Sequence, residues 1–484
     1  METNPEAPAA GILEYKSGTL LLRLPHETAP LPRVFSHLFV KDERVHAYRA
    51  NAYDYAAICR IAHYSGITLE DRARNYTTPD LKLHTRFEIR PHQQRALDAW
   101  KENKCRGIVE MPTGSGKSFL AVLAMAMVNR STLVVVPTID LMLQWERNLK
   151  GFFRREIGLL GGGSHEIKDV TVATYDSAAL KMEFMGDQFG LVIFDECHHL
   201  PGEVNRIAAS AAIAPYRLGL SATPEREDGK DTVSEKLLGK IVCRIHIDEL
   251  EGNILSPYVT RRLQIELTPE EEEAYRKARE IYLSFVKYHH IDFSQPNSWQ
   301  EFIALAARAP GGREAMKAYL LQRRIARCSG SKEKAVWELL RKHAGERILI
   351  FTAENEAAYS MGERFCLPVI THQTKSNERK DFLEKFRNGV YPVLLTSKVL
   401  NEGVDVPEAS IGIVVSGSGS TREHVQRLGR ILRAREGKQA LLYELVSAGT
   451  SEMSVSERRR RHRAYGAAPL PSGRGEKEED ENAY

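Results

Sequence analysis

The chain has little of what usually holds small secreted proteins or membrane proteins together. Its six cysteines in 484 residues are scattered and form no C-x-x-C pair. This favours free thiols in a reducing compartment over a disulfide framework or a cysteine-based metal site. No apolar run is long enough to span a bilayer, and the acidic, proline-containing start has no signal-peptide pattern. The sequence therefore predicts a cytoplasmic protein without membrane attachment.

An excess of one charge is also missing. Lysine and arginine number 68 against 64 aspartates and glutamates, so the formal net charge is only +4. Any contact with a polyanion must therefore come from local basic surfaces and not from a field around the whole molecule. The 42% hydrophobic and 27% charged composition is that of a soluble globular protein. The length suffices for about three domains.

The most informative stretch is an apolar segment at 108–110, followed by a loop of small residues at 111–118 and a helix-favouring segment at 119–124. The loop is close to the pattern G-x-x-x-x-G-K-[ST], with Met111 in place of the first glycine. In such a unit, backbone N–H groups and the helix dipole attract phosphate oxygens, the lysine reaches the β- and γ-phosphates, and the last hydroxyl binds Mg²⁺. We therefore predict a nucleoside triphosphate site with Lys117 catalytic and Ser118 on the metal, formed by Thr113, Gly114, Ser115, Gly116, Lys117 and Ser118.

A second apolar run, 191–194, ends in two carboxylates, Asp195 and Glu196. Such a pair can also cap a helix, but next to a phosphate loop it is expected at the carboxyl edge of the same sheet. There Asp195 can hold Mg²⁺, and Glu196 can orient and deprotonate the attacking water. Upstream, Gln93 precedes a helix predicted at 94–101. A glutamine in that position is usually solvated, but beside a phosphate loop its amide can bind an adenine edge.

Alternating strand and helix patterns begin near residue 87 and resume near residue 347, with strands predicted at 133–136, 170–174, 217–223, 393–397, 411–415 and 440–443. This alternation indicates α/β units with parallel sheets covered by helices on both faces. We predict a small α+β domain at 1–85, a first lobe at 86–250, a linker and helical insert at 251–335, a second lobe at 336–450, and a polar tail, largely disordered, at 451–484.

The N-terminal domain and the insert carry weaker signals. A hairpin is predicted around residues 16–18 and a helix around residues 58–62, while residues 42–50 have the composition of a solvated edge strand. The insert favours helices, one opening at residues 270–273 and a second, basic one after Gly311 and Gly312. A solvated face and a nucleic-acid clamp explain these charges equally well, so both interpretations stay open.

The second α/β unit has no phosphate loop and offers a basic helix instead, predicted at 421–435. Helical spacing places Gln426, Arg430 and Arg433 on one face. Opposite a polyphosphate, an arginine can neutralise the charge that develops on the γ-phosphoryl group, worth roughly 10³–10⁵ in rate in other NTPases. The alternative is an exposed basic helix. Gly429 inside this segment costs about 1 kcal/mol relative to alanine, which favours close approach to another group.

Taken in order, these segments resemble the motif set of superfamily 2 helicases. The matches are Gln93 (Q motif), 111–118 (motif I), Pro137 and Thr138 (motif Ia), 195–198 (motif II in a DExH form), 221–223 (motif III), 396–405 (motif V) and 426–433 (motif VI). Within that superfamily the chain most resembles the XPB family in its compact archaeal and bacterial form. Residues 226–228 match its RED motif, residues 42–50 resemble its N-terminal damage-recognition domain, and the insert stands where the family has its thumb.

The resemblance implies two RecA-like lobes, ATP and Mg²⁺ as cofactors, and 3′→5′ unwinding of, or movement along, double-stranded or forked DNA in repair. It implies catalytic roles for Gln426, Arg430 and Arg433, with the two arginines reaching the ATP site from the second lobe. It places nucleotide contacts at Gly403 and Asp405. Nucleic-acid contacts are implied at Pro137, Thr138, Thr396, Arg226, Glu227 and Asp228. It further allows a structure-specific nuclease as partner, and a monomer associated with the nucleoid if the source is prokaryotic.

Three other interpretations share part of this evidence. A DNA translocase subunit of a restriction or defence system carries the same motifs, but the chain shows no recognisable nuclease motif, and the Arg-Glu-Asp triplet favours XPB. An RNA helicase is disfavoured by Asp-Glu-Cys-His at motif II. A non-catalytic DNA-binding scaffold is disfavoured by the intact Lys117, Asp195, Glu196, Arg430 and Arg433.

Overall fold

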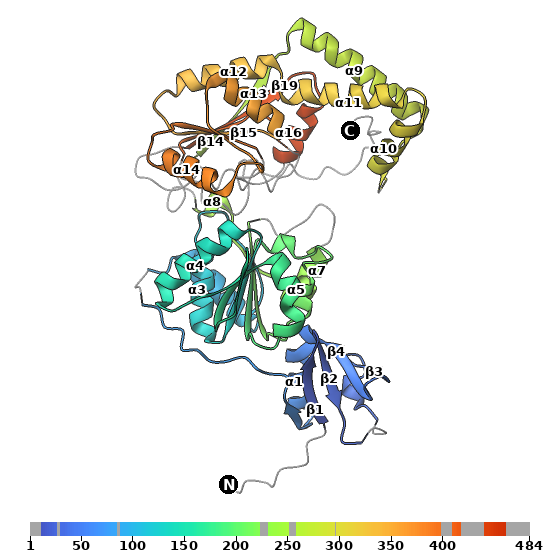
Figure 1. Cartoon of the computed structure of the whole chain (residues 1–484), viewed down its shortest axis with the longest axis vertical. Helices are drawn as coiled ribbons and strands as arrows, with labels where there is room; N and C mark the ends of the chain where they lie inside the picture. Colours follow the sequence, from blue (N-terminus) through green and yellow to red (C-terminus); the bar gives the residue numbers. More distant parts are fainter. Residues whose placement is uncertain are drawn as a thin grey trace. The chain divides into compact units, whose positions relative to one another are not determined.

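The computed structural model describes residues 11–26, 30–84, 88–222, 231–250, 258–295, 297–397, 409–417 and 440–460. These residues form two compact units, the first reaching Ile245 and the second starting at His246 (Figure 1). The first unit holds a small N-terminal domain and an α/β lobe. The second holds another α/β lobe and a group of long helices. Among the described residues, no helix combines the length and apolarity needed to cross a membrane.

The N-terminal domain is a five-stranded sheet in the order β3-β4-β2-β1-β5. Its strands are β1 (Gly11–Lys16), β2 (Thr19–Arg23), β3 (Val40–Asp42), β4 (Ala47–Asn51) and β5 (Leu69–Asp71), with α1 (Tyr55–Tyr64) and short 3₁₀ turns at Arg33–Phe35 and Ala52–Asp54. The predicted hairpin and helix are confirmed. Ser17 and Gly18 make the hairpin turn, both with positive φ. Of the residues predicted as one edge strand, β3 lies at the edge and β4 pairs on both sides.

The first lobe is built on an eight-stranded sheet in the order β13-β6-β12-β11-β7-β10-β8-β9, parallel except for β9. The strands are β6 (Arg106–Glu110), β7 (Thr132–Val136), β8 (Gly158–Gly161), β9 (Ser164–Glu166), β10 (Val170–Thr174), β11 (Leu191–Asp195), β12 (Tyr216–Ser221) and β13 (Ile241–Arg244). Every residue of β7, β10 and β11 is buried, as expected for strands covered on both faces.

Helices connect these strands and pack on the sheet. They are α2 (Pro91–Glu102), α3 (Lys117–Val128), α4 (Ile139–Phe153), α5 (Tyr175–Met185), α6 (Ile207–Ser210) and α7 (Asp231–Leu238). The short helix α8 (Ile247–Leu250) follows β13 and belongs to the second unit. The strands and helices predicted for this lobe from their apolar patterns are therefore confirmed, with ends shifted by a few residues.

The N-terminal domain is bonded to the first lobe at the amino edge of its sheet. The Tyr15 hydroxyl lies 2.7 Å from the carbonyl oxygen of Met182 and 2.8 Å from that of Ala211, in the segments that lead into β11 and β12. Ile213 of the lobe is part of the N-terminal domain's own core. Residues 75–84 then run along the lobe as an extended strap, held for example by the Leu81 N–H bond to Asn129.

The second unit has a six-stranded parallel sheet in the order β14-β19-β18-β15-β17-β16. Its strands are β14 (Tyr258–Ile265), β15 (Ile348–Phe351), β16 (Val369–Ile370), β17 (Val393–Thr396), β18 (Ile411–Val414) and β19 (Ala440–Ser447). Helices α12 (Gly330–Lys342), α13 (Asn355–Phe365), α14 (Ser376–Arg387) and α16 (Glu452–Arg460) complete the lobe. β14 falls in the range predicted as linker and insert, yet it pairs with β19 over eight residues. The sheet therefore begins before the insert.

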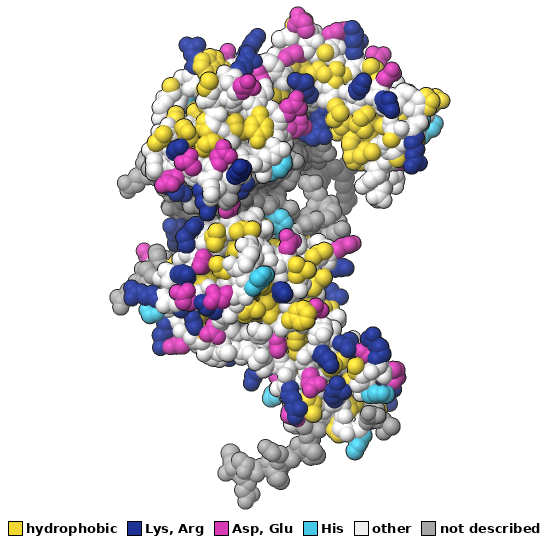
Figure 2. All heavy atoms as spheres, viewed as in Figure 1, with side chains coloured by type: hydrophobic (Ala, Val, Ile, Leu, Met, Phe, Trp, Pro, Cys, Tyr) yellow, Lys and Arg dark blue, Asp and Glu magenta, His cyan; other side chains and the backbone are white. Residues whose placement is uncertain are grey.

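The insert itself is made of α9 (Pro269–Tyr288), α10 (Ser298–Arg308) and α11 (Gly312–Arg327). Helices were predicted at the positions of α9 and α11, but α10 was not foreseen. The three helices enclose an aromatic core that includes Tyr282, Phe285 and Phe302. Trp299 and Leu320 of the insert are exposed, and Figure 2 shows apolar side chains on the surface of this part of the chain.

Arg217 on β12 shows how the first lobe satisfies buried polar groups. Its side chain is fully buried, and the guanidinium donates to four backbone carbonyl oxygens, those of Ala209, Ala212, Ala214 and Leu237, at 2.6–3.0 Å. Burial lowers the pKa of this guanidinium well below its usual value. One side chain thus supplies donors for the loop between α6 and β12 and for the end of α7.

We expect replacement of Arg217 by methionine to lower the free energy of unfolding of the first lobe by about 3 kcal/mol or more, because several buried carbonyl groups lose their donors at once. Urea unfolding followed by tryptophan fluorescence measures the change, since Trp100 and Trp145 lie in this lobe. The exposed Arg206 gives a control variant, Arg206→Met, expected to change the stability by less than about 0.5 kcal/mol. Equal stability of the two variants would contradict the assigned role.

Candidate nucleotide site

Four neighbouring strands bring the predicted motifs of the first lobe to one edge of the sheet. The order β6-β12-β11-β7 is parallel throughout, so their carboxyl ends lie side by side. The predicted phosphate loop follows β6, Asp195 ends β11, Ser221 ends β12, and Pro137 follows β7. In open α/β sheets this edge is where ligands bind.

The phosphate loop connects Glu110, the last residue of β6, to Lys117, the first residue of α3. Gly114 and Gly116 have φ of 84° and 92°, a left-handed conformation that favours glycine. The Ser115 hydroxyl donates to the carbonyl oxygen of Pro112 at 2.6 Å, which closes the loop on itself. Thr113 Oγ1 is buried without a hydrogen-bond partner among the described residues. A buried hydroxyl of this kind keeps donor capacity that a phosphate oxygen can accept.

The structure brings Lys117 and Glu196, which are 79 positions apart, into direct contact. Lys117 Nζ donates to Glu196 Oε1 at 3.2 Å, and both side chains are buried. A charge at this depth is stable only if it is paired, so the lysine of the loop and the carboxylate after β11 stabilise each other's ionised forms.

Asp195 is the more strongly perturbed carboxyl group of the pair. Its Oδ2 accepts a hydrogen bond from Trp145 Nε1 at 2.9 Å, and its Oδ1 accepts one from the backbone N–H of Glu196 at 3.0 Å. Burial, followed by the nearby charge of Glu196, raises the pKa of Asp195 to about 6, although Lys117 and these hydrogen bonds act in the opposite direction. The group is therefore costly to ionise, and a bound cation would offset that cost.

Three side chains that support this site were not identified from the sequence. Trp145 was placed only on the predicted α4 helix, and its bond to Asp195 depends on how α4 packs. Tyr175 donates from its hydroxyl to the carbonyl oxygen of Asp195 at 3.1 Å. His198 Nδ1 lies 3.1 Å from Ser221 Oγ and so connects the turn after β11 to the end of β12. Contacts that join separate helices and strands leave no periodic signal in a sequence.

Gln93 contacts the phosphate loop from the first turn of α2. Its Oε1 accepts from the backbone N–H of Arg90 at 3.1 Å, and its Nε2 lies 3.4 Å from the carbonyl oxygens of Ser115 and Gly116. The structure thus places this glutamine at the predicted site, whereas its contact with adenine stays a prediction.

The residues predicted to contact nucleic acid differ in how deeply they are buried. Thr138 Oγ1 caps α4 by accepting from the backbone N–H of Leu141 at 3.2 Å, directly after Pro137. The Thr396 side chain is fully buried, with its hydroxyl donating to the carbonyl oxygen of Ser397 at 2.9 Å. The side chain is therefore not exposed in this conformation, and the contact of Thr396 with nucleic acid stays a prediction.

Several predicted site residues lie outside the described residues, so their positions stay predictions. They are Arg226, Glu227 and Asp228 after motif III, Gly403 and Asp405 of motif V, and Gln426, Arg430 and Arg433 of motif VI.

A metal ion fits the donor set at this edge. Mg²⁺ is usually bound through one or two carboxylates, a hydroxyl, waters and substrate phosphates, so Asp195 and Ser118 are suitable donors. Among the described residues, no group of three or more His, Cys, Asp or Glu side chains is placed to form a metal cage of its own. The chemistry of the donors thus suits a metal that arrives together with a nucleotide.

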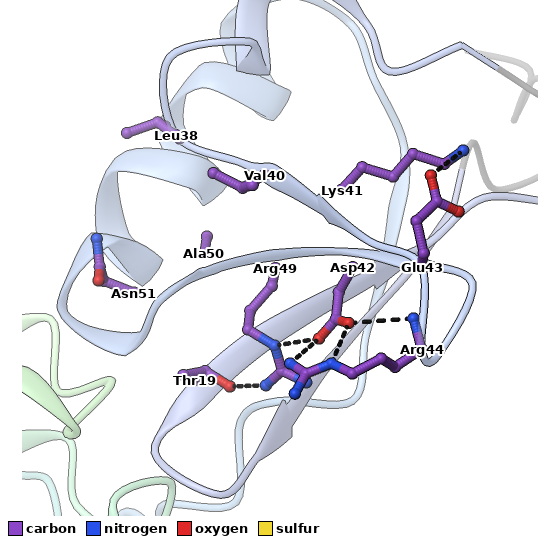
Figure 3. A pocket seen from close by; sticks show the side chains of 10 residues that line it. All are labelled: Thr19, Leu38, Val40, Lys41, Asp42, Glu43, Arg44, Arg49, Ala50 and Asn51. Carbon is purple, nitrogen blue, oxygen red and sulfur yellow. Dashed lines mark hydrogen bonds and ion pairs between the residues drawn. The ribbon is translucent and has the colours of Figure 1, made fainter.

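A second polar feature lies on the N-terminal domain. A cavity of about 530 Å³ is lined by β3, β4 and the turn between them, and Figure 3 shows Arg44 and Arg49 both pointing at Asp42. Arg44 Nε and Arg49 Nε each donate to this buried carboxylate at 2.9 Å, which holds its pKa far below the usual range. Lys41 pairs with Glu43 at the rim. One acidic group thus fixes two guanidinium groups at the surface, where Lys and Arg side chains gather in Figure 2.

Three family models match the chain in order. The model for the "Xeroderma pigmentosum group B helicase damage recognition domain" matches residues 13–73, the model for the "Type III restriction enzyme, res subunit" matches residues 86–226, and the model for the "ERCC3/RAD25/XPB C-terminal helicase" matches residues 316–464. Two of the three models are specific to one family, and they match on both sides of the more general one.

The curated proteins that resemble the chain carry the names of the same family. The chain is 38% identical over 418 residues to the DNA 3′-5′ translocase XPB2 of Sulfurisphaera tokodaii, with 86% of this chain and 94% of the relative covered. It is 29% identical to the DNA 3′-5′ helicase XPB of Mycobacterium tuberculosis (79% and 65% covered). It is 27% identical to the general transcription and DNA repair factor IIH helicase/translocase subunit XPB/SSL2 of Saccharomyces cerevisiae (83% and 47% covered). The chain thus spans nearly all of the first relative but only about half of the yeast protein.

Solved structures with a similar fold include the Saccharomyces cerevisiae Dbp5 protein bound to RNA and ADP BeF3, with a TM-score of 0.54 and 14% identity over 78% of this chain and 88% of that chain. The helicase domain of Pyrococcus furiosus Hef has a TM-score of 0.50 and 17% identity over 76% of this chain and 98% of that chain. At these identities the likeness shows the fold alone, a pair of RecA-like lobes.

The raised pKa of Asp195 generates a stability prediction for the metal-free protein. The carboxyl group ionises near pH 3.8 when unfolded and near pH 6 when folded, so the folded state holds the extra proton between these values. Wild-type stability relative to Asp195→Asn therefore falls as the pH rises from about 4 to about 6 and stays low above that. A difference of about two pH units corresponds to roughly 3 kcal/mol.

We therefore expect the stability of the wild type, measured relative to Asp195→Asn, to be lower at pH 7.5 in EDTA than at pH 4.5. Urea unfolding at several pH values measures both proteins. The exposed Asp98→Asn on α2 serves as a control that should show no such trend. A stability difference between the two proteins that stays the same at all these pH values would mean that the ionised carboxylate is fully compensated in the folded state.

Proposed function

The chain belongs to the XPB family of superfamily 2 helicases, and from this premise we propose that it is an ATP-dependent DNA 3′-5′ helicase or translocase that acts in DNA repair. The observation that carries the proposal is the buried contact between Lys117 and Glu196 beside Asp195, because these are the groups that hydrolysis of a triphosphate requires. The names of the relatives support DNA as the track and 3′-5′ as the direction.

We assign the steps of hydrolysis to this chain's own residues. The backbone N–H groups at the start of α3 bind the phosphates, and Lys117 pairs with their negative charge. Ser118 and Asp195 would hold Mg²⁺, which would supply positive charge to offset the negative charge of the phosphates. Glu196 then orients the attacking water and accepts its proton, since Lys117 can exchange its pairing with Glu196 for pairing with phosphate. From the sequence alone, we assign charge neutralisation on the γ-phosphoryl group to Arg430 and Arg433.

Hydrolysis does work on DNA only if nucleotide binding changes the affinity for DNA. A ligand shifts an equilibrium between two conformations only by its difference in affinity for them. We propose that the two lobes bind DNA differently with and without the γ-phosphate, as ordered segments do in other phosphate-driven switches.

On the N-terminal domain, the fixed guanidinium groups of Arg44 and Arg49 suit the phosphate backbone of double-stranded or forked DNA. We therefore expect the chain to work where DNA is, in the cytoplasm and nucleoid if its source is prokaryotic.

A translocase subunit of a restriction system is the second candidate, favoured by the match of residues 86–226 to the restriction-enzyme model. That match covers only the first lobe. The models that match residues 13–73 and 316–464 are those of XPB proteins. We therefore prefer the repair helicase, and a structure-specific nuclease as its protein partner is a proposal that rests on the family alone.

We expect Lys117→Ala to reduce ATP hydrolysis at least about 100-fold, because the variant loses the cation that pairs with the phosphates. DNA binding should be retained, since Lys117 is buried in the first lobe. A DNA-stimulated ATPase assay with a parallel DNA-binding titration measures both quantities. The exposed Lys101→Ala at the end of α2 is the matched control and should hydrolyse ATP like the wild type. Unchanged hydrolysis by Lys117→Ala would refute the site.

The direction and the type of nucleic acid form a separate prediction. We expect strand displacement on DNA duplexes with a 3′ single-stranded tail, and none on 5′-tailed DNA or on RNA duplexes of the same sequence. Lys117→Ala should displace no strand on any substrate. Displacement that starts from a 5′ tail, or that is faster on RNA, would overturn the assignment while leaving the ATPase site intact.

A further inference from the structure

His92, in the first turn of α2, makes the shortest contact between that helix and the phosphate loop. The side chain is buried, and its Nε2 lies 2.9 Å from the carbonyl oxygen of Ser115, a residue that is itself fully buried. A carbonyl oxygen only accepts hydrogen bonds, so Nε2 must carry the hydrogen. Neither the motif pattern nor the family resemblance identified this residue from the sequence.

The geometry of the peptide bond gives this contact a consequence for phosphate binding. The bond between Ser115 and Gly116 is planar and trans, so the carbonyl of Ser115 and the N–H of Gly116 point to opposite sides of the chain. Because His92 holds the carbonyl on the side of α2, the N–H of Gly116 points away from α2. The carbonyl of Gly116 already accepts from the N–H groups of Phe119 and Leu120 in α3, which orients the next N–H, that of Lys117, in the same way.

The Ser115–Gly116 peptide is the part of the loop that most needs this support. Gly116 has φ of 92° and no side chain, so its backbone can rotate with little steric resistance. Rotation of this peptide would turn the Ser115 carbonyl oxygen toward the phosphates, where its partial negative charge repels them. The loop also packs closely against α2, because a Cβ atom at Gly116 would collide with Gln93 Nε2.

We propose that His92 is a positioning residue for triphosphate binding: by donating from Nε2 to the Ser115 carbonyl, it keeps the Gly116 N–H available to a phosphate oxygen. The inference rests on the proposed nucleotide site and adds a residue to it. His92 acts through the backbone of the loop, so its contribution concerns the phosphates and not the base.

The test compares two unbranched replacements of similar length. In glutamine, Nε2 stands the same number of bonds from Cα as Nε2 of histidine, so His92→Gln can keep the donor. His92→Met has a methyl group there and cannot donate. We expect His92→Met to weaken ATP binding about 10-fold, because the buried Ser115 carbonyl loses its closer donor and keeps Gln93 Nε2 at 3.4 Å. His92→Gln should stay within about 3-fold of the wild type. The exposed Gln94→Ala on the same helix should match the wild type.

Competition of a fluorescent ATP analogue by ATP and by inorganic tripolyphosphate separates phosphate recognition from base recognition. The proposal requires His92→Met to lose affinity for tripolyphosphate by a factor similar to its loss for ATP. An unchanged tripolyphosphate affinity in His92→Met, or a His92→Gln variant as weak as His92→Met, would overturn it. A wild-type protein that binds neither ligand would instead refute the nucleotide site itself. Thermal melting of each variant verifies folding, and the Gln–Met comparison remains informative if both melt lower.

Discussion

Two adjacent carboxylates, Asp195 and Glu196, are buried at the end of a central strand, and the surroundings of the candidate site keep this arrangement stable. Taking each ion out of water costs several kcal/mol even after the protein relaxes. This burial, and after it the neighbouring charge of Glu196, raises the pKa of Asp195. Lys117 offsets part of it from the phosphate loop, and Trp145 donates a hydrogen bond from α4. The site therefore depends on three segments of the lobe at once.

The sheet explains why those segments meet. In the order β6-β12-β11-β7, segments far apart in the chain follow neighbouring parallel strands and end at the same edge. The N-terminal domain is bonded at the other edge, where Tyr15 contacts the segments that precede β11 and β12. Nucleotide chemistry and the basic surface around Arg44 thus occupy opposite ends of one unit.

Sequence patterns foretold most of the described strands of both lobes and the helices α2, α3 and α4 of the first, because each repeats an apolar period that burial requires. They also identified Lys117, Asp195 and Glu196, since a phosphate loop and a strand ending in carboxylates are local patterns. They did not reveal α10, which lies between two stronger helix signals, or the place of β14, whose partner β19 is more than 180 residues away. The roles of Trp145 and His92 were not predicted for a related reason. They depend on packing between elements that lie far apart in the sequence, so no short segment of sequence reveals them.

Gln93 shows how base and phosphate recognition can be joined in one helix turn. Its amide oxygen accepts from the Arg90 backbone but has a second lone pair, and its NH₂ group faces the loop while carrying two hydrogens. An adenine edge could therefore use the second lone pair of this oxygen directly, and it would compete with the carbonyl oxygens of Ser115 and Gly116 for the NH₂ hydrogens. Its neighbour His92 meanwhile holds the Ser115 carbonyl. A nucleotide whose base binds Gln93 would thus hold the first turn of α2 in place. Because His92 lies in the same turn, the Ser115–Gly116 peptide that faces the phosphates would be held as well. Correct binding of the base would then favour correct binding of the phosphates.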